Sequence, residues 1–373
     1  MRQLTRPTPV LFVIHKFDRR AGPDQLVAGL LERLDRTRWA PSLFMLDFEL
    51  FDGPSLLEET MPKDVPLRTA PWRRGKGLPA AIRAFQQMRA DVQAEVIHSH
   101  DMPSHLVSVP LIGRRGPVRL ASLHGIVDQT QRQRQWNALG RWLMGRMDHV
   151  FLSSDYVRSA VPNIPDQRCT MLLNAIDVSA FSAREPDRLA RPFSPDDPLR
   201  LICVARVSEE KGHVHLIEAM TRLTDLPVTL DIVGTGPWLD EIRAKAASVS
   251  NVTVHGFVED AAGMFRNSDA FVLASIRESL SIGVLEAMAL GLPVLTTRVG
   301  AHPQVVGDSG AGTVVPHSDP EALAATLRGW LTDPAQLVDM AKNGLREVHA
   351  SHSMEHYTDV TQDIYSQCLH SRT

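Results

Sequence analysis

Short, continuously apolar runs recur along the chain, beginning with Val10–Ile14 near its start. Such runs are typical of strands that are buried on both faces of a parallel sheet. Between them lie longer stretches, such as Leu26–Leu34 and Ala80–Met88, in which apolar residues recur at helical spacing. Strands that alternate with helices predict α/β domains built on parallel sheets.

The alternation is interrupted between Phe181 and Pro198, where proline and charged residues replace the apolar pattern. A segment of this composition is typical of a linker between domains. We therefore predict two doubly wound, Rossmann-like domains that face a central cleft, at residues 1–182 and 183–350, with 183–198 as the linker. Residues 351–373 are predicted to form a helical tail.

The stretch from Ser275 to Val306 contains a helix with well-marked ends. The apolar pattern Ile282–Leu290 follows a polar segment that includes Glu278, and it stops at Gly291, two residues before Pro293. Glycine supplies the left-handed residue after a helix, and proline cannot continue it. The start of this helix would offer unpaired N–H groups and a positive dipole end, which together bind anions.

Glu278 and Glu286 are eight positions apart, too far for both carboxylates to share one bond. They would suit the two ends of a long ligand with a phosphate in the middle, such as a nucleotide sugar. The alternative is that both are solvated glutamates beside a buried helix. Spacing alone leaves both interpretations open.

Composition is that of a globular protein, with 373 residues, 43% of them apolar and 22% charged. No apolar run is long enough for a membrane span, and PVLFVI is too short for the core of a signal peptide, so we expect a cytoplasmic protein. The cysteines Cys169, Cys203 and Cys368 are widely spaced, which predicts neither a disulfide framework nor a zinc site.

Charge is divided unevenly along the chain. Residues 1–180 contain 24 Lys+Arg against 18 Asp+Glu, a net charge of +6, while the remainder has 16 against 25, a net charge of −9. Basic residues form three clusters, at Arg73, Arg74 and Lys76, at Arg114, Arg115 and Arg119, and at Arg132, Arg134 and Arg141. An apolar stripe consists of Trp136, Leu139, Leu143 and Met147. These features suit an anionic membrane surface or an acidic acceptor. A solvated basic surface and a core-facing stripe explain them equally well.

Candidate phosphate ligands follow the strand pattern LICVARV, where Arg206 is followed five residues later by Lys211. Because strand ends in doubly wound sheets face the ligand crevice, two cations here are placed to meet a phosphate. Gly234 and Gly236 follow the next strand and would allow the backbone to approach a ligand. The alternative for Arg206 and Lys211 is an exposed turn without a ligand. The alternative for Gly234 and Gly236 is a tight turn with no binding role.

Histidines end two predicted strands in the first half, His100 in EVIHSHD and His124 in RLASLHG. A zinc site that includes His98 and His100 is disfavoured, because no acidic or cysteine ligands accompany them. His124, followed by glycine, is placed to meet a bound ligand, although a core histidine is the alternative. The chain contains no Asp-x-Asp pair, which argues against a metal ion bridging a nucleotide diphosphate.

These motifs together resemble the retaining glycosyltransferases of family 4, which have the GT-B fold. ESLSIGVLEAMALGLPV is similar to the Glu-x7-Glu motif of that family, and VARVSEEKG to its Arg-to-Lys phosphate motif. HGFVED, DAFVLAS, GAHPQVV, DPEALA, SLHGI, FLSSDYVRSA and NAIDVSAF also match in order. The resemblance covers nearly the whole chain.

The resemblance implies that a sugar passes from a nucleotide sugar, UDP- or GDP-linked, to a glycan, lipid-linked or small-molecule acceptor, with the anomeric configuration kept. The first domain would bind the acceptor and the second the donor, and the C-terminal helix would pack back on the first domain. No cofactor, metal ion or nucleic acid is expected. The motifs assign catalytic roles to His124, Arg206, Lys211 and Glu278. Donor contacts are assigned to Gly22, Gly234, Gly236, His255, Gly256, Phe257, Val258, Leu280, Ser281, Ile282 and Glu286.

The chain departs from the family pattern at Pro23, Ala175, Gln304 and the Leu280-Ser281 pair. None of these changes removes a charge on which the assignment depends. Two other functions are considered beside the transferase. One is a nucleotide-sugar 2-epimerase or hydrolase on the same fold, and the other is a nucleotide-sugar-binding protein without catalysis.

Overall fold

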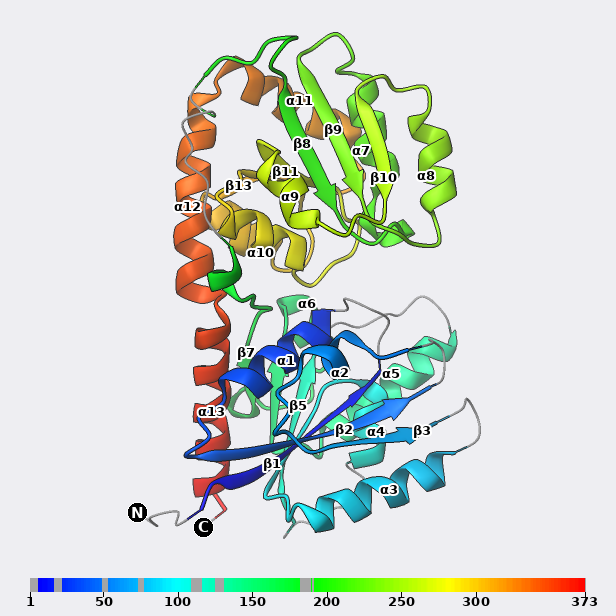
Figure 1. The fold of residues 1–373 in the computed structure, drawn as a ribbon, viewed down its shortest axis with the longest axis vertical. Helices are drawn as coiled ribbons and strands as arrows, with labels where there is room; N and C mark the ends of the chain where they lie inside the picture. The colour runs from blue at the N-terminus through cyan, green and yellow to red at the C-terminus, as the bar shows by residue number, and fades with distance from the viewer. Residues whose placement is uncertain are drawn as a thin grey trace. The chain divides into compact units, whose positions relative to one another are not determined.

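The computed structural model describes residues 6–16, 22–48, 53–72, 77–108, 116–124, 131–181, 189 and 191–372. The chain forms two compact units (Figure 1). Unit 1 comprises Met1–Asn174 with Met354–Thr373, and unit 2 comprises Ala175–Ser353. Each unit is an α/β layer structure around one parallel sheet, which confirms the predicted fold class.

Unit 1 contains seven parallel strands in the order β3-β2-β1-β4-β5-β6-β7. The central position of β1 explains its sequence, because Val10–Ile14 have no exposed surface on either face of the sheet. The strands are β1 (Thr8–His15), β2 (Trp39–Asp47), β3 (Leu67–Pro71), β4 (Val96–Ser99), β5 (Val118–Leu123), β6 (His149–Leu152) and β7 (Cys169–Met171).

The helices of unit 1 pack in two groups. Helix α1 contacts α2 and α13, whereas α4 contacts both α3 and α5. Their bounds are α1 (Gly22–Arg33), α2 (Leu56–Thr60), α3 (Leu78–Asp91), α4 (Met102–Ser108), α5 (Gln131–Met144), α6 (Asp155–Ser159) and α13 (Met354–His370).

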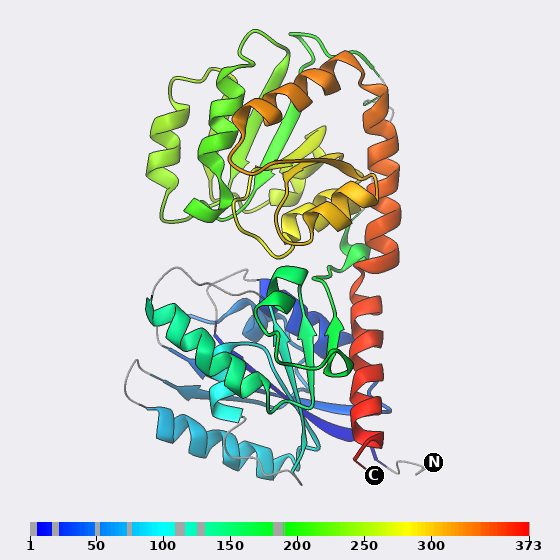
Figure 2. The ribbon, with the colours of Figure 1, turned by 180° about the vertical axis from the view of Figure 1, so that it is seen from behind.

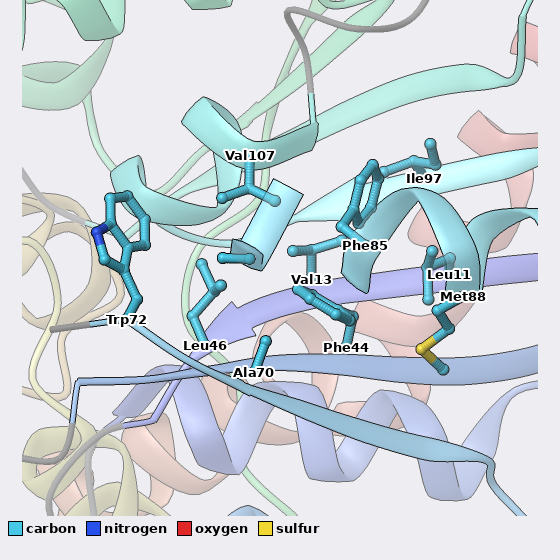
Figure 3. Close-up of a cluster of buried hydrophobic side chains, with 11 residues drawn as sticks. Leu11, Val13, Phe44, Leu46, Ala70, Trp72, Phe85, Met88, Ile97 and Val107 are labelled. Carbon is cyan, nitrogen blue, oxygen red and sulfur yellow. The ribbon is translucent and has the colours of Figure 1, made fainter. Parts of the chain in front are cut away.

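One buried cluster joins the sheet of unit 1 to α3 and α4 (Figure 3). Alternate residues of β1 face this cluster, so Leu11 and Val13 contribute to it while Phe12 does not. Phe85 from α3 meets Phe44 from β2 edge to face, with ring centroids 5.6 Å apart. This packing fixes the strands whose carboxyl ends carry the polar residues described below.

Helix α13 belongs to unit 1 although it is last in the sequence (Figure 2). It packs on α1, where a Cβ added at Gly29 would lie 2.5 Å from the terminal methyl of Met354. Glycine therefore allows the close approach of the two helices. Tyr357 and Tyr365 of α13 are buried in unit 1.

Unit 2 contains six parallel strands in the order β10-β9-β8-β11-β12-β13. Every residue of β11 and β12 is buried, as expected for central strands covered on both faces. The strands are β8 (Leu199–Val204), β9 (Val228–Val233), β10 (Val252–Gly256), β11 (Ala270–Leu273), β12 (Val294–Thr297) and β13 (Gly312–Val315).

The helix predicted after the polar segment of unit 2 is α10, Ile282–Ala289. Leu290 caps it and Gly291 has a φ of 72°, so the predicted left-handed stop is confirmed. The other helices are α7 (His213–Thr221), α8 (Leu239–Ala246), α9 (Ala261–Arg266), α11 (Pro320–Thr332) and α12 (Ala335–Ser351).

The apolar stripe on and after α5 faces inward where the structure describes it. Leu143 and Met147 are buried in a cluster with Val150, and Leu139 packs against that cluster. The side chains of Arg132, Arg134 and Trp136 lie outside the described part, as do the residues Arg73, Arg74, Lys76, Arg114 and Arg115. In that part, no helix is both long and apolar enough to cross a membrane.

Candidate active site

The carboxyl ends of β8 and β11 bring Arg206, Lys211 and Glu278 to one edge of the unit 2 sheet. The two strands are neighbours, and Arg206 follows β8 while Glu278 follows β11. Lys211 lies in the turn between β8 and α7, and its Nζ forms an ion pair with Glu278 Oε2. Residues 67 positions apart are therefore joined, as strand ends in an open α/β sheet allow.

The Lys211–Glu278 pair is mostly shielded from solvent, with side chains 17% and 16% exposed. Glu278 also accepts a hydrogen bond through Oε1 from the backbone N–H of Ser279 at 3.2 Å. Arg206 differs, because it is exposed and has no ion-pair partner among the residues that the structure describes. The site therefore has two cations that differ in their contacts. Lys211 is held in an ion pair, and Arg206 is exposed to solvent.

Two glycines allow the loops of this edge to lie close together. Gly212, with a φ of 64°, follows Lys211, and a Cβ there would lie 2.0 Å from the carbonyl oxygen of Ala274. Gly300, with a φ of 52°, would place a Cβ 2.3 Å from the carbonyl oxygen of Glu278. A side chain at either position would collide with that backbone, so both loops require glycine here.

The start of α10 lies at the same edge. A Cβ added to Gly283, in its first turn, would lie 2.9 Å from the carbonyl oxygen of Val204, the last residue of β8. The side chain of the N-cap residue Ser281 accepts no capping hydrogen bond from the helix. Because the first N–H groups of a helix lack partners within it, the positive end of α10 lies at the edge of the sheet that also carries Arg206.

The other residues predicted near α10 differ in burial. Leu280 and Ser281 are buried, whereas Ile282 and Glu286 are partly exposed. Glu286 lies within α10, one helical turn beyond its start.

His302 is a buried histidine that the sequence analysis did not identify as a site residue. It lies near the Lys211–Glu278 pair, after β12, and its Nδ1 is 2.9 Å from Thr296 Oγ1. Burial lowers the pKa of His302 to about 4, so its ring is neutral at pH 7. Its position inside GAHPQVV, a motif with a turn glycine, was the available signal.

The remaining predicted donor residues of unit 2 follow β9 and β10. Gly234 and Gly236 pack against the carbonyl oxygens of Ala205 and Val207, at 1.9 and 2.1 Å from an added Cβ. They therefore join the loops after β8 and β9.

His255 and the residues after it end β10, the edge strand. His255 Nε2 lies 2.7 Å from Asp231 Oδ1, Gly256 has a φ of 78°, and Phe257 is 64% exposed. Val258 is partly exposed. An exposed phenylalanine at a strand end presents an aromatic ring of the kind that stacks on other rings.

In unit 1, His124 follows β5 and is partly exposed, and Gly22 is the first residue of α1. Burial lowers the pKa of His124 to about 4. Nearby, His15 at the end of β1 pairs with Asp101 after β4, with 3.1 Å between Nδ1 and Oδ2. The carboxyl ends of three neighbouring strands thus carry polar side chains in unit 1 as well.

Comparison with known protein families shows to which family the chain belongs. The model described as "Glycosyltransferase Family 4" matches residues 20–180, and that described as "Glycosyl transferases group 1" matches residues 186–347. The chain belongs to this glycosyltransferase family. Its two parallel-sheet units form the GT-B fold, and the protein is an enzyme of the glycosyltransferase class.

Among its relatives is the lipopolysaccharide core biosynthesis mannosyltransferase LpcC of Rhizobium leguminosarum, 28% identical over 249 residues, which are 64% of this chain and 69% of LpcC. Another is a GDP-mannose-dependent phosphatidylinositol monomannoside mannosyltransferase of Mycolicibacterium smegmatis, 30% identical over 63% of this chain and 66% of that protein. The fold is similar to that of Anabaena HepE in complex with UDP, with a TM-score of 0.79, 16% identity, and coverage of 96% of this chain and 100% of HepE.

Proposed function

We propose that this glycosyltransferase moves a sugar from a UDP- or GDP-linked donor to a glycan or lipid-linked acceptor, with retention at the anomeric carbon. The observation that carries the proposal is the edge of the unit 2 sheet, which carries Arg206, the Lys211–Glu278 ion pair and the start of α10. Two cations and a helix start are suited to a diphosphate, and a carboxylate is suited to sugar hydroxyl groups.

The chemistry follows from these charges. In a front-face reaction the acceptor oxygen bonds to the anomeric carbon on the side from which the diphosphate oxygen leaves. The acceptor proton passes to the departing diphosphate, so atoms and charge balance without a covalent intermediate on the enzyme. Arg206 and Lys211 would stabilise the negative charge that develops on the leaving group, which is where charged donors lower a barrier most. No metal ion takes part in this proposal.

The identity of the donor base is proposed from relatives. One is named GDP-mannose-dependent, and HepE was solved with UDP. The roles of His255–Val258 and Glu286 toward the base and the ribose, and of units 1 and 2 toward acceptor and donor, belong to the same proposal. Peripheral binding to an anionic membrane surface stays a prediction, and Arg119, one of the basic residues behind it, is paired with Asp148 at 3.3 Å.

The test is release of nucleoside diphosphate from a panel of nucleotide sugars in the presence of a metal chelator. We expect one sugar and base to be preferred, and Arg206→Ala to lower that rate about 100-fold. Arg222→Ala is the matched control, because Arg222 is exposed in the same unit and pairs with Glu321 at 3.0 Å. Equal losses in the two variants, or activity lost with the chelator, would contradict the proposal.

An added acceptor separates the alternatives. A transferase gives a new glycosidic bond whose anomeric configuration, measured by NMR coupling, matches the donor. A hydrolase gives free sugar, and a 2-epimerase gives a product inverted at C2, in both cases at the same rate with or without acceptor. A protein that only binds nucleotide sugars gives ligand-induced stabilisation and no nucleoside diphosphate.

A further inference from the structure

The ring of His124 contacts the ring of His100 within unit 1. His100 directly follows β4 and His124 directly follows β5, and these strands are paired in register from Val96↔Val118 to Ser99↔Ala121. Nδ1 of His100 lies 3.2 Å from Nε2 of His124, and the two ring planes differ by only 9°. This distance and orientation are those of a hydrogen bond between two imidazoles.

Both rings are neutral at physiological pH. Burial lowers the pKa of His124 to about 4 and lowers that of His100 well below its usual value, and neighbouring histidines add to the effect on His100. A neutral imidazole carries one N–H and one bare nitrogen. The hydrogen bond therefore holds a single proton, which belongs either to His100 Nδ1 or to His124 Nε2.

The surroundings of His100 decide which nitrogen carries that proton. His100 is 1% exposed, and its second nitrogen, Nε2, is buried with no hydrogen-bond partner. If the shared proton belonged to His124, His100 would carry an N–H on Nε2 without an acceptor. Proteins leave buried N–H groups unpaired less often than buried acceptors. The proton is therefore placed on His100 Nδ1, and His100 Nε2 is the bare nitrogen.

We propose that His100 is a positioning residue that donates to His124 Nε2 and so fixes His124 with its proton on Nδ1, ready to donate to a substrate hydroxyl group. Nδ1 of His124 makes no hydrogen bond to any residue that the structure describes. Within the described part of the chain, it is the ring nitrogen that remains for a ligand. This inference rests on the proposed transferase function only for the nature of the ligand.

Two aromatic neighbours hold the His100 ring in the required plane. Phe12 of β1 stacks on it with centroids 5.9 Å apart, and His98 lies on it at 4.2 Å. His98 is itself fixed at both nitrogens, by Tyr365 of α13 at 2.7 Å and by Ser122 of β5 at 2.8 Å. The last helix of the chain thereby supports the orientation of a residue after β5.

With Nε2 accepting from His100 and Nδ1 protonated, His124 has no free lone pair and does not act as a general base. It stabilises a substrate oxygen as a neutral donor instead. In the transferase, the acceptor proton then leaves with the diphosphate and does not pass through His124.

The experiment is a long-range ¹H–¹⁵N spectrum of the full chain labelled with ¹⁵N-histidine, which distinguishes protonated from bare ring nitrogens. His124 is assigned by the loss of its signals in His124→Asn. We expect the proton of His124 on Nδ1 in the wild type. In His100→Phe, which cannot donate to His124 Nε2, we expect His124 to be a mixture of its two neutral tautomers. In His100→Asn, whose amide N–H can occupy the place of Nδ1, we expect the Nδ1-protonated form of His124 to be restored.

Kinetics give the second readout. His100→Phe is expected to lower kcat about five- to tenfold, as for one hydrogen bond, with little change in KM for the donor, and His100→Asn to recover most of it. The control is His149→Phe, which removes another buried histidine of the same sheet, bonded to Thr170 at 2.8 Å. It should leave the His124 tautomer unchanged.

Finding the His124 proton on Nε2 in the wild type would overturn the proposal, even if His100→Phe fails to fold. An unchanged tautomer in His100→Phe, or equal effects in His149→Phe, would do the same. These outcomes would leave the proposed function standing, because that depends on nucleoside diphosphate release and Arg206.

Discussion

The two units place opposite chemistry at the same edge of the same kind of sheet. In unit 1 the strand ends carry three histidines that burial keeps neutral, His98, His100 and His124, and one carboxylate, that of Asp101, which pairs with His15. In unit 2 they carry charges, with Arg206 exposed and Lys211 paired to Glu278. One edge is suited to hydrogen bonding with neutral groups, and the other is suited to an anion.

Net charge along the chain runs the other way. Residues 1–180 carry +6 and the rest of the chain −9, a division close to but not identical with the two units. The acidic half therefore holds the two cations, and the basic half holds the neutral histidines. The comparison shows that a few residues after the strands decide the chemistry of such a site, whereas overall charge describes the outer surface.

The largest expected effect comes from removing Lys211, the cation of unit 2 that is paired with Glu278. Lys211→Ala leaves Glu278 without its partner and removes a positive charge from the predicted diphosphate site. We expect kcat for nucleoside diphosphate release to fall about 100- to 1,000-fold. Lys245→Ala is the control, since Lys245 is 44% exposed and reaches Glu241 only at 4.0 Å. A loss below about tenfold would mean that the anion lies elsewhere.

Most of the carboxyl edge of the unit 2 sheet could be predicted from the sequence, because patterns of neighbouring residues determine its elements. Strand runs, the helix start at Ile282 and the stop at Gly291 depend on neighbouring residues, and the structure has them where the pattern placed them. The roles of Arg206 and Lys211 came from motif spacing within one loop. They are still predictions, although the structure brings both residues to the edge where Glu278 lies.

What the sequence could not predict are contacts that depend on strand register and on distant elements. His100 and His124 meet because β4 and β5 pair in one register, and no local pattern encodes that register. Tyr365 reaches His98 from 267 positions away. Burial decides that these histidines are neutral, and burial is a property of the packed unit and not of the motif.

The second expected effect concerns a buried carboxyl group in unit 1. Asp24 of α1 is fully buried, and burial raises its pKa to about 7, with Asp101 and Glu58 adding to the rise and His15 opposing it. Since the folded pKa is above the unfolded value of 3.8, stability is highest below that value and is lost as pH rises through about 7.

Asp24→Asn removes this ionisation, so its free energy of unfolding relative to wild type should rise by about 3 kcal/mol between pH 4 and pH 8. Urea unfolding at both pH values measures it. Asp35→Asn is the matched control, because Asp35 lies in the same unit on the surface and the Thr37 side chain lowers its pKa. A pH-independent difference for Asp24→Asn would show that the carboxyl is already ionised in the folded unit.

The third expected effect concerns His105 in α4. Here stability is lost as pH falls, whereas for Asp24 it is lost as pH rises. This histidine is fully buried, and burial lowers its pKa to about 4, against 6.5 when unfolded. The stability that depends on its neutral form is present above pH 6.5 and is lost as pH falls toward 4. The wild type should therefore lose about 2.5 kcal/mol through this residue between pH 7 and pH 4.5.

His105→Asn keeps an amide near Ser99 Oγ, the partner of His105 Nδ1 at 2.7 Å, and should remove that part of the acid sensitivity. The change between the two pH values is the quantity of interest, since the substitution also alters packing at neutral pH. His356→Asn, on the surface of α13, should leave the acid sensitivity as it is. Equal acid loss in wild type and His105→Asn would contradict the neutral assignment.

The smallest effect separates the two cations of unit 2. Arg206 is exposed, so salt screens its attraction for a nucleoside diphosphate, whereas the Lys211–Glu278 pair is partly shielded. Raising NaCl from about 0.05 to 0.5 M should weaken nucleoside diphosphate binding about two- to fivefold in calorimetry. Arg206→Ala should bind more weakly and show a smaller salt response, because the screened contact is gone. If wild type and variant responded equally to salt, Arg206 would not contact the anion, and the difference between the two edges would rest on Lys211 and the start of α10 alone.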